Sequence, residues 1–146
     1  MNLNIDNFSL TNRNLTLKKI SELNELTLKY GLKLTDKEIN NLIDHKNNIL
    51  KEIGRVEILD NTLENLIYEF CDSNYIDSEN YYQILYELTN IFYIYQNEFC
   101  HKLTDEQIIK YLKFNFENNC ASSIELLESV YFEDLKNKLS NGLNDE

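Results

Sequence analysis

The chain has 146 residues, of which 42% are hydrophobic, so it can fill a core and is not a disordered polymer. Its 14 basic and 25 acidic residues give a formal net charge of −11, which disfavours binding to nucleic acid or to an anionic membrane surface. An acidic mimic of DNA is the weaker alternative, because the acidic residues alternate with apolar ones and belong on the solvated faces of helices.

The cellular compartment follows from what the sequence lacks. No stretch of 18 apolar residues is present, and the N-terminus has neither the basic nor the apolar region of a secretion signal. Cys71, Cys100 and Cys120 are odd in number and widely spaced, which excludes a disulfide framework and an ordinary zinc site. We therefore expect a cytoplasmic protein with reduced cysteines and no association with membranes.

The backbone pattern predicts an all-α fold. The sequence contains no proline and only three glycines, and its apolar residues recur at intervals near 3.6. Gly31, Gly54 and Gly142 each follow a periodic run, as residues that end helices in the left-handed conformation do. We predict a single compact domain of five to six helices at residues 15–141, around a long central fourth helix at about 78–101.

The two ends of the chain fall outside this domain. Residues 1–14 alternate weakly between apolar and polar side chains, so we expect an N-terminal arm that is disordered or packed as an extended strand. Residues 142–146 form a short acidic tail.

The first two helices have clear boundaries. The first covers about residues 15–30. The second opens at Thr35, whose side chain caps the helix while Glu38 reaches back to the cap amide, and it closes at Gly54. The segment 55–59 is either a strand-like connector or an extra helical turn. The residues expected to face inward are Leu17, Ile20, Leu23, Leu26, Ile39, Leu42, Ile43, Leu50 and Ile53.

The other helices follow from similar signals. A short third helix begins after residues 60–61, and Asp77 or Ser78 caps the long fourth. The fifth opens at Thr104 and the sixth at Ser122, each with a capping box. The residues expected to face inward are Leu63, Leu66, Ile67, Phe70 and Cys71 on the third helix, Tyr81, Ile84, Leu85, Leu88, Ile91, Phe92, Tyr95 and Phe99 on the fourth, Ile108, Ile109, Leu112 and Phe116 on the fifth, and Ile124, Leu127, Tyr131 and Leu135 on the sixth.

One segment nearly repeats: "KLTDKEI" at 33–39 returns as "KLTDEQI" at 102–108. A duplicated helical hairpin would leave such a trace, but the flanking residues do not keep the register. We interpret the repeat as one capping solution used twice.

The junction before the fourth helix, "FCDSNYIDSENYY" at 70–82, contains the start of a calcium-loop pattern. A calcium loop needs oxygen ligands at positions 1, 3 and 5, glycine at position 6 and a bidentate glutamate at position 12. Counted from Asp72, positions 5, 6 and 12 are Ile76, Asp77 and Gln83. The segment is therefore interpreted as a helix junction and not as a metal loop.

Glu98 and His101 have the spacing of the carboxylate–imidazole pairs of di-iron helical bundles. Such a centre needs a second pair, and the other histidine, His45, has Leu42 at the position of the carboxylate. Cys100 and His101 do not make a nucleophile pair, because neighbours on a helix point roughly 100° apart. We predict no catalytic residue and no metal site, with Glu98 and His101 as weak metal candidates.

The fourth helix carries a second stripe of side chains, formed by Tyr82, Tyr86, Thr89, Tyr93 and Cys100. At roughly 100° per residue it lies about a third of a turn or more from an apolar face that already suffices for a core. One interpretation is that the helix is central and a neighbouring helix covers the stripe. The other is that Tyr82, Tyr86 and Tyr93 form an interface, in a homodimer or with a partner protein, because tyrosine offers a large contact area with few rotatable bonds.

Four segments together resemble a known group of proteins: "LKYGLKLTDKEI", "GRVEI", "LIYEFCDSNYIDSENY" and "IFYIYQNE". They look like an uncharacterised family of small helical proteins from Firmicutes of the clostridial type, a domain of unknown function. The resemblance covers about residues 15–135. It implies a lineage, but no activity, cofactor or functional residue.

Two functions from different classes remain. The lack of clustered glycines excludes a P-loop, a Rossmann fingerprint and a nucleophile elbow. This favours a non-enzymatic cytoplasmic module for protein interaction or regulation, with no cofactor and no nucleic-acid partner. The alternative is a small-molecule or metal-binding enzyme with a site built from scattered residues near Glu98 and His101, which a deep polar pocket would favour.

Overall fold

The computed structural model describes the backbone of residues 5–55, 61–121 and 123–141, and the side chains from residue 12 onward within these ranges. Every regular element there is helical, which confirms the predicted all-α fold. The elements are α1 (Ile5–Thr27), the short 3-10 helix η1 (Leu28–Tyr30), α2 (Asp36–Glu52), α3 (Thr62–Phe70), α4 (Tyr81–Phe99), α5 (Asp105–Asn118), α6 (Glu125–Glu128) and α7 (Val130–Asn141). Apart from the very short η1 and α6, this part of the chain holds six helices, within the predicted range.

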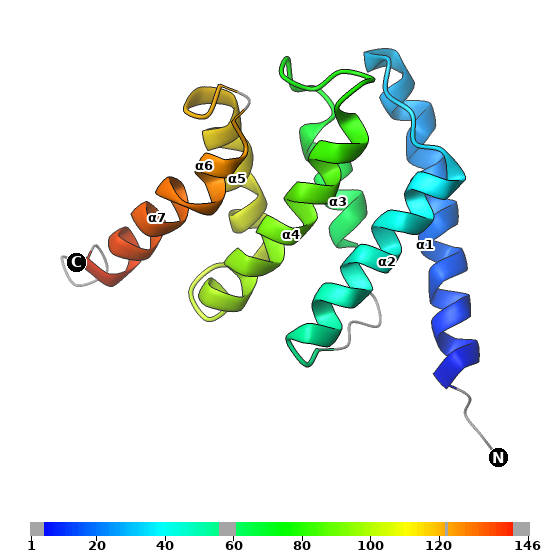
Figure 1. Ribbon diagram of the computed structural model, residues 1–146, viewed down its shortest axis with the longest axis horizontal. Coiled ribbons are helices and arrows are strands. Elements are labelled where there is room, and N and C mark those ends of the chain that lie inside the picture. The colour runs from blue at the N-terminus through cyan, green and yellow to red at the C-terminus, as the bar shows by residue number, and fades with distance from the viewer. Residues whose placement is uncertain (1–4, 56–60, 122, 142–146) are drawn as a thin grey trace.

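The helices form two layers (Figure 1). α1, α3 and α5 lie side by side in one layer, and α2, α4 and the α6–α7 pair lie in front of them in the other. α4 packs against α2 in its own layer and against both α3 and α5 behind it. The long fourth helix is therefore central, as predicted, and successive helices make three hairpins placed next to one another.

The core is built from the faces that the apolar periodicity predicts. On α3, α4 and α5, every residue predicted to face inward is buried. Burial is weaker on α1, where Ile20 is fully buried but Leu17 and Leu23 are only partly buried. This difference follows from position, because α1 is at the edge of its layer and has α3 on one side only.

The first helix begins well before its predicted start. α1 starts at Ile5 and not near residue 15, so the expectation of a disordered or strand-like arm is wrong for residues 5–14. This segment contains no proline or glycine that would stop a helix. Arg13 also ties it to α2, since its guanidinium forms an ion pair with Asp44 and donates a hydrogen bond of 3.1 Å to Asn40 Oδ1.

α2 and α5 begin with capping boxes, as predicted. Thr35 Oγ1 accepts a hydrogen bond from the Glu38 amide at 3.1 Å, and Glu38 Oε1 accepts one from the Thr35 amide at 2.9 Å. Thr104 and Gln107 form the same pair at the start of α5. The two nearly repeated segments thus supply the same cap at two helix starts.

Two of the predicted helix-ending glycines have the expected conformation. Gly31 follows η1 with φ of +76°, and Gly54 follows α2 with φ of +70°. A side chain with a Cβ would be strained at either position. The predictions that lie outside the described residues are Gly142, the connector at 56–59, the Ser122 cap and the tail at 142–146.

α4 begins at Tyr81, slightly inside its predicted range. The turn before it is held by Asp77, whose Oδ1 accepts hydrogen bonds from the amides of Glu79 and Asn80 at 2.9 and 3.0 Å. Asn80 Oδ1 in turn accepts a hydrogen bond from the Asp77 amide at 2.8 Å. The N-cap of α4 is Asn80, without a side-chain cap bond, so the predicted cap at Asp77 or Ser78 is wrong. Asp77 instead satisfies two amides in the turn that enters the helix.

The predicted sixth helix is broken at Ser129 into α6 and α7. Two side chains bond to backbone carbonyls near this break. Ser129 Oγ donates a hydrogen bond to the Glu125 carbonyl at 3.1 Å, and Tyr95 Oη on α4 donates one to the Leu127 carbonyl at 2.6 Å. The Tyr95 bond is buried and fixes α6 against α4.

Candidate functional site

The tyrosine stripe of α4 is divided between the core and the surface. Tyr93 is 1% exposed and Thr89 is fully buried, whereas Tyr82 is partly buried and Tyr86 is 36% exposed. The Tyr93 ring packs edge-on against Phe92, with 5.1 Å between the ring centroids. This corrects the surface interpretation for Tyr93, because the central position of α4 encloses that part of the helix. Tyr82 and Tyr86 are left as candidates for contact with a partner.

Tyr86 is held in place by His45 of α2. The two rings are stacked, with 3.6 Å between their centroids and 11° between their planes. Tyr82 lies one turn earlier, and its ring centroid is 6.1 Å from that of Tyr86. Sequence reasoning alone does not find the His45–Tyr86 pair. The one signal is that His45 lies three residues after Leu42 and four before Ile49, on the edge of the buried face of α2.

The imidazole of His45 is partly buried and uncharged at neutral pH. Its Nε2 is enclosed and has no hydrogen-bond partner among the described residues. Burial is the main influence on this group and lowers the pKa of His45 below 6.5, against the opposing effects of the Tyr86 backbone and the Glu52 carboxylate. The ring therefore presents a neutral, flat surface to Tyr86.

The lowered pKa of His45 predicts a dependence of stability on pH. Unfolded His45 takes up a proton below about pH 6.5, while folded His45 stays neutral to a lower pH, so the unfolded state binds more protons in this window. Stability contributed by neutral His45 is therefore present above about pH 6.5 and decreases as the pH falls through the window below it.

The variant His45→Phe tests this, because phenylalanine keeps a flat ring against Tyr86 but does not titrate. We expect the wild type to lose stability relative to His45→Phe between about pH 6.5 and pH 5, measured by urea unfolding at several pH values. An NMR titration of the His45 ring should give a midpoint below 6.5. A stability difference that does not change with pH would contradict the assignment.

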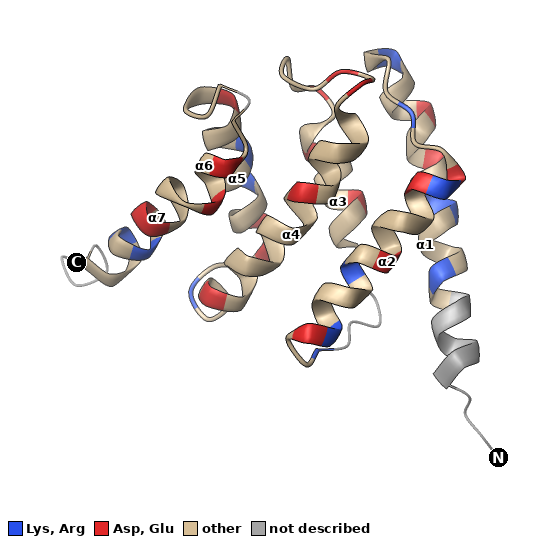
Figure 2. Cartoon of the chain, viewed as in Figure 1, with Lys and Arg blue, Asp and Glu red and all other residues tan. Residues whose placement is uncertain are grey.

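A pocket of about 190 Å³ lies beside the His45–Tyr86 stack, between α2, α4 and α6. Its lining consists of His45, Tyr86, Glu87, Asn90, Ile91, Ile124, Glu125 and Glu128. Ile91 and Ile124 are buried and give the pocket an apolar part. The other lining residues are polar or aromatic, and three of them are glutamates. Figure 2 shows acidic residues along α4, α6 and α7 on this side of the molecule.

Among the described residues, only one of the three carboxylates of this pocket has a hydrogen-bond partner. Glu125 Oε2 accepts a hydrogen bond from Ser123 Oγ at 3.1 Å. The side chains of Glu87 and Glu128 form no hydrogen bond or ion pair within the part of the chain that the structure describes. The pocket is therefore an acidic site with an aromatic wall.

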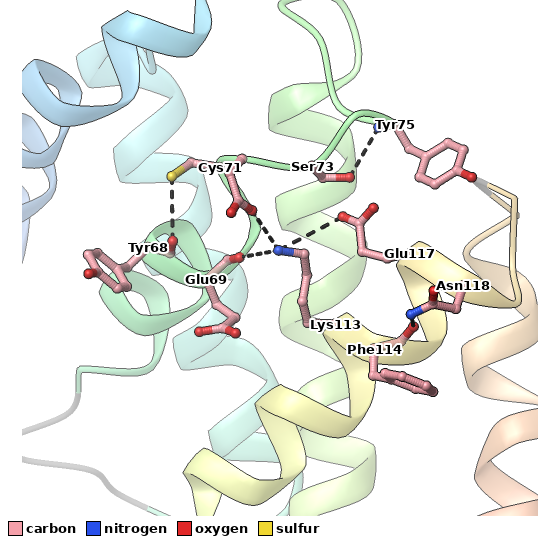
Figure 3. Close-up of polar contacts among 10 residues, drawn as sticks. Tyr68, Glu69, Cys71, Ser73, Tyr75, Lys113, Phe114, Glu117 and Asn118 are labelled. Carbon is pink, nitrogen blue, oxygen red and sulfur yellow. Dashed lines mark hydrogen bonds and ion pairs between the residues drawn. The ribbon is translucent and has the colours of Figure 1, made fainter.

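A second polar cluster surrounds Lys113 and joins α5 to the end of α3 (Figure 3). Lys113 Nζ donates hydrogen bonds to the Glu69 carbonyl at 2.7 Å and to Asp72 Oδ1 at 2.6 Å, and it lies 3.9 Å from Glu117 Oε1. It also lies 5.7 Å from the centroid of the Phe70 ring. A cation at this position satisfies the Glu69 carbonyl in the last turn of α3. The carboxylate of Asp72, the first position of the calcium-like pattern, is thus used as a structural contact.

Cys71 lies next to this cluster and has a structural environment. A hollow of about 210 Å³ is lined by Leu26, Lys29, Tyr30, Tyr68, Glu69, Cys71, Asp72 and Lys113. The thiol of Cys71 donates a hydrogen bond to the Tyr68 carbonyl at 3.4 Å, and burial raises its pKa. A thiol with a raised pKa is a poor nucleophile at neutral pH, so this hollow does not have the chemistry of a cysteine enzyme.

The end of α4 holds the residues proposed for the alternative function. Glu98, Cys100 and His101 are all exposed, and buried Phe99 lies between Glu98 and Cys100. None of the three lines the acidic pocket. Within the described ranges, no group of three or more His, Cys, Asp and Glu side chains could hold a metal ion.

The fold and the pocket together define the class of protein. It is an all-α domain of three adjacent helical hairpins, with an acidic pocket that has an aromatic wall on one face. The chain belongs to DUF6323, a family of unknown function, whose model matches residues 19–145. This confirms the resemblance at the level of the family, while the origin in Firmicutes stays a prediction. No curated protein and no solved structure matches the chain. In the described part of the chain, no helix is both long enough and apolar enough to span a bilayer.

Proposed function

We propose that this protein is a non-enzymatic cytoplasmic module that binds another protein through the α2–α4–α6 face, defined by Tyr82, Tyr86, His45 and the acidic pocket beside them. The observation that carries the proposal is the exposed ring of Tyr86, held flat on His45 at the edge of that pocket. Rigid, partly exposed tyrosine side chains are typical of the centres of protein interfaces.

The arrangement of the helices supports the same proposal. Adjacent helical hairpins expose an extended face made of one helix from each hairpin, and helical-repeat proteins use such faces to bind partners. Here α2, α4 and α6 are those helices. The residues of the alternative enzyme function, Glu98 and His101, lie away from the pocket, so no specific contact favours a catalytic site.

The charge on this face favours a different protein over a second copy of the chain. In a symmetric dimer the same patch would meet itself, so Glu87, Glu125 and Glu128 would approach their own copies. Like charges brought together in an interface oppose association. A net charge of −11 adds to this repulsion and attracts a basic partner.

The test compares two exposed tyrosines by affinity purification from the native host with quantitative mass spectrometry. We expect a stoichiometric partner with the wild type and with Tyr68→Ala, since Tyr68 is 65% exposed but lies on α3 in the other layer. We expect at least about tenfold less partner with Tyr86→Ala, because hot-spot tyrosines contribute about 2 kcal/mol or more.

Sedimentation and circular dichroism supply the controls for this experiment. Both variants should have the helicity of the wild type, and the purified wild type should sediment as a monomer. Loss of the partner with Tyr68→Ala but not with Tyr86→Ala would place the interface in the other layer. Recovery of a bound metabolite instead of a protein would overturn the proposal.

A further inference from the structure

We infer that the acidic pocket between α2, α4 and α6 receives an arginine side chain of the partner protein. This inference rests on the proposed function, since it names the chemistry that the α2–α4–α6 face recognises. Size, charge and shape of the pocket each support it separately.

The size of the pocket suits one side chain. Its volume is about 190 Å³. Sites for small molecules and cofactors usually enclose about 300–1,000 Å³. A pocket below that range, open beside an exposed tyrosine, fits a single long side chain of a protein better than a whole metabolite.

The charge of the pocket favours a cation. Three of its eight lining residues are glutamates, and none is lysine or arginine. The side chains of Glu87 and Glu128 have no cationic partner within the described ranges, so a cation from outside would be the first to neutralise them. Glu87 is partly buried, whereas Glu125 and Glu128 are exposed, so a cation would gain most from its ion pair with Glu87.

The shape and hydrogen-bonding capacity of the pocket favour arginine over lysine. A guanidinium is flat, stacks on aromatic rings and carries five N–H donors, whereas an ammonium is compact and has three. The stacked rings of His45 and Tyr86 supply an aromatic wall. Glu87 and Asn90 on α4 and Glu128 on α6 supply acceptors from two helices. His45 is neutral at pH 7, so it does not repel the cation.

The binding test is an NMR titration of the purified protein with Nα-acetyl-arginine amide. We expect saturable shifts of backbone amides at residues 86–91 and 124–128, in the millimolar range that is typical of a single contact. The neutral analogue Nα-acetyl-citrulline amide has nearly the same shape and should give no saturable shift. The lysine analogue should bind more weakly than the arginine analogue.

Paired variants test whether the pocket carboxylates carry this binding. The double variant Glu87→Gln with Glu128→Gln should bind Nα-acetyl-arginine amide at least about tenfold more weakly, since it loses two charge-assisted hydrogen bonds. The matched control is Glu98→Gln with Glu133→Gln, which makes the same change in net charge at exposed positions outside the pocket. The control should bind within about twofold of the wild type.

Several results would overturn the inference. These are equal binding of the citrulline analogue, equal loss in both double variants, or saturation of the same amides by calcium chloride alone with no effect of arginine amide. Failure of this inference is distinguishable from failure of the proposed function. If Tyr86→Ala still removes the partner while Glu87→Gln with Glu128→Gln retains it, the face is correct and the arginine contact is wrong.

Discussion

Truncation of Tyr93 to alanine is expected to lower the free energy of unfolding by about 3–5 kcal/mol, the usual cost of removing a large buried aromatic side chain. Tyr93 is 1% exposed in the middle of α4, the helix that contacts both layers. Its removal would leave a cavity that the surrounding helices can fill only partly. The measurement is urea unfolding followed by circular dichroism at 222 nm.

Tyr86→Ala is the matched control for this experiment, because it makes the same chemical change on the same helix. Tyr86 is 36% exposed and its main contact is the stacked ring of His45. We expect a clearly smaller loss than for Tyr93→Ala, of which about 0.5–1.5 kcal/mol comes from the aromatic pair beyond its buried area. Equal losses for the two variants would contradict the assignment of Tyr93 to the core and Tyr86 to the surface.

The comparison also separates the two roles of the tyrosine stripe. If Tyr93→Ala is too unstable to purify, Tyr93→Phe keeps the ring and should stay folded with the helicity of the wild type. Replacing Tyr86 and Tyr93 together cannot test an interface, because the Tyr93 change would unfold the domain. The interface is therefore tested with Tyr86 alone.

Replacing Lys113 by methionine is expected to destabilise the protein by about 2 kcal/mol, since hydrogen bonds to charged groups contribute about 1.5–3 kcal/mol each. Methionine keeps most of the aliphatic stem but removes the ammonium that bonds to the Glu69 carbonyl and Asp72. The Lys113 side chain is 15% exposed, so water replaces its contacts poorly. Thermal and urea unfolding would both report the change.

Lys110→Met is the control, because Lys110 lies one turn earlier on α5 and pairs with Glu106 at 3.9 Å in an open position. Exposed pairs of this kind contribute about 0.3–0.5 kcal/mol. We also expect the effect of Lys113→Met to persist in about 1 M salt, where exposed pairs are screened. A loss for Lys113→Met no larger than that for Lys110→Met would show that the α3–α5 junction does not depend on this cation.

The Lys113 cluster and the acidic pocket lie in different layers of the fold. The Lys113 cluster fixes α3 to α5 in one layer, whereas the pocket and Tyr86 belong to α2, α4 and α6 in the other. Tyr95 links the two roles, since its hydroxyl holds the Leu127 carbonyl and so positions α6 beside the pocket. The double variant of the pocket glutamates and its control outside the pocket should therefore both be folded, because neither removes one of these contacts.

The sequence by itself determined the features that depend on residues close together in the chain. The capping boxes at Thr35 and Thr104 need only a residue three positions away, so their sequence signals are sufficient. The apolar faces of α3, α4 and α5 follow from a periodicity of 3.6, and all their predicted residues are buried. The left-handed turns at Gly31 and Gly54 are local in the same sense.

Only the tertiary structure decided which neighbour covers each face. In the early part of α1, Arg13 contacts α2. Near the break before α7, Tyr95 on α4 donates a hydrogen bond to the Leu127 carbonyl. The sequence also could not distinguish the two tyrosines of the candidate site, because Tyr86 and Tyr93 lie on the same stripe of α4. Periodicity places both on the same side of the helix, but packing between helices buries one and leaves the other beside His45 and an acidic pocket.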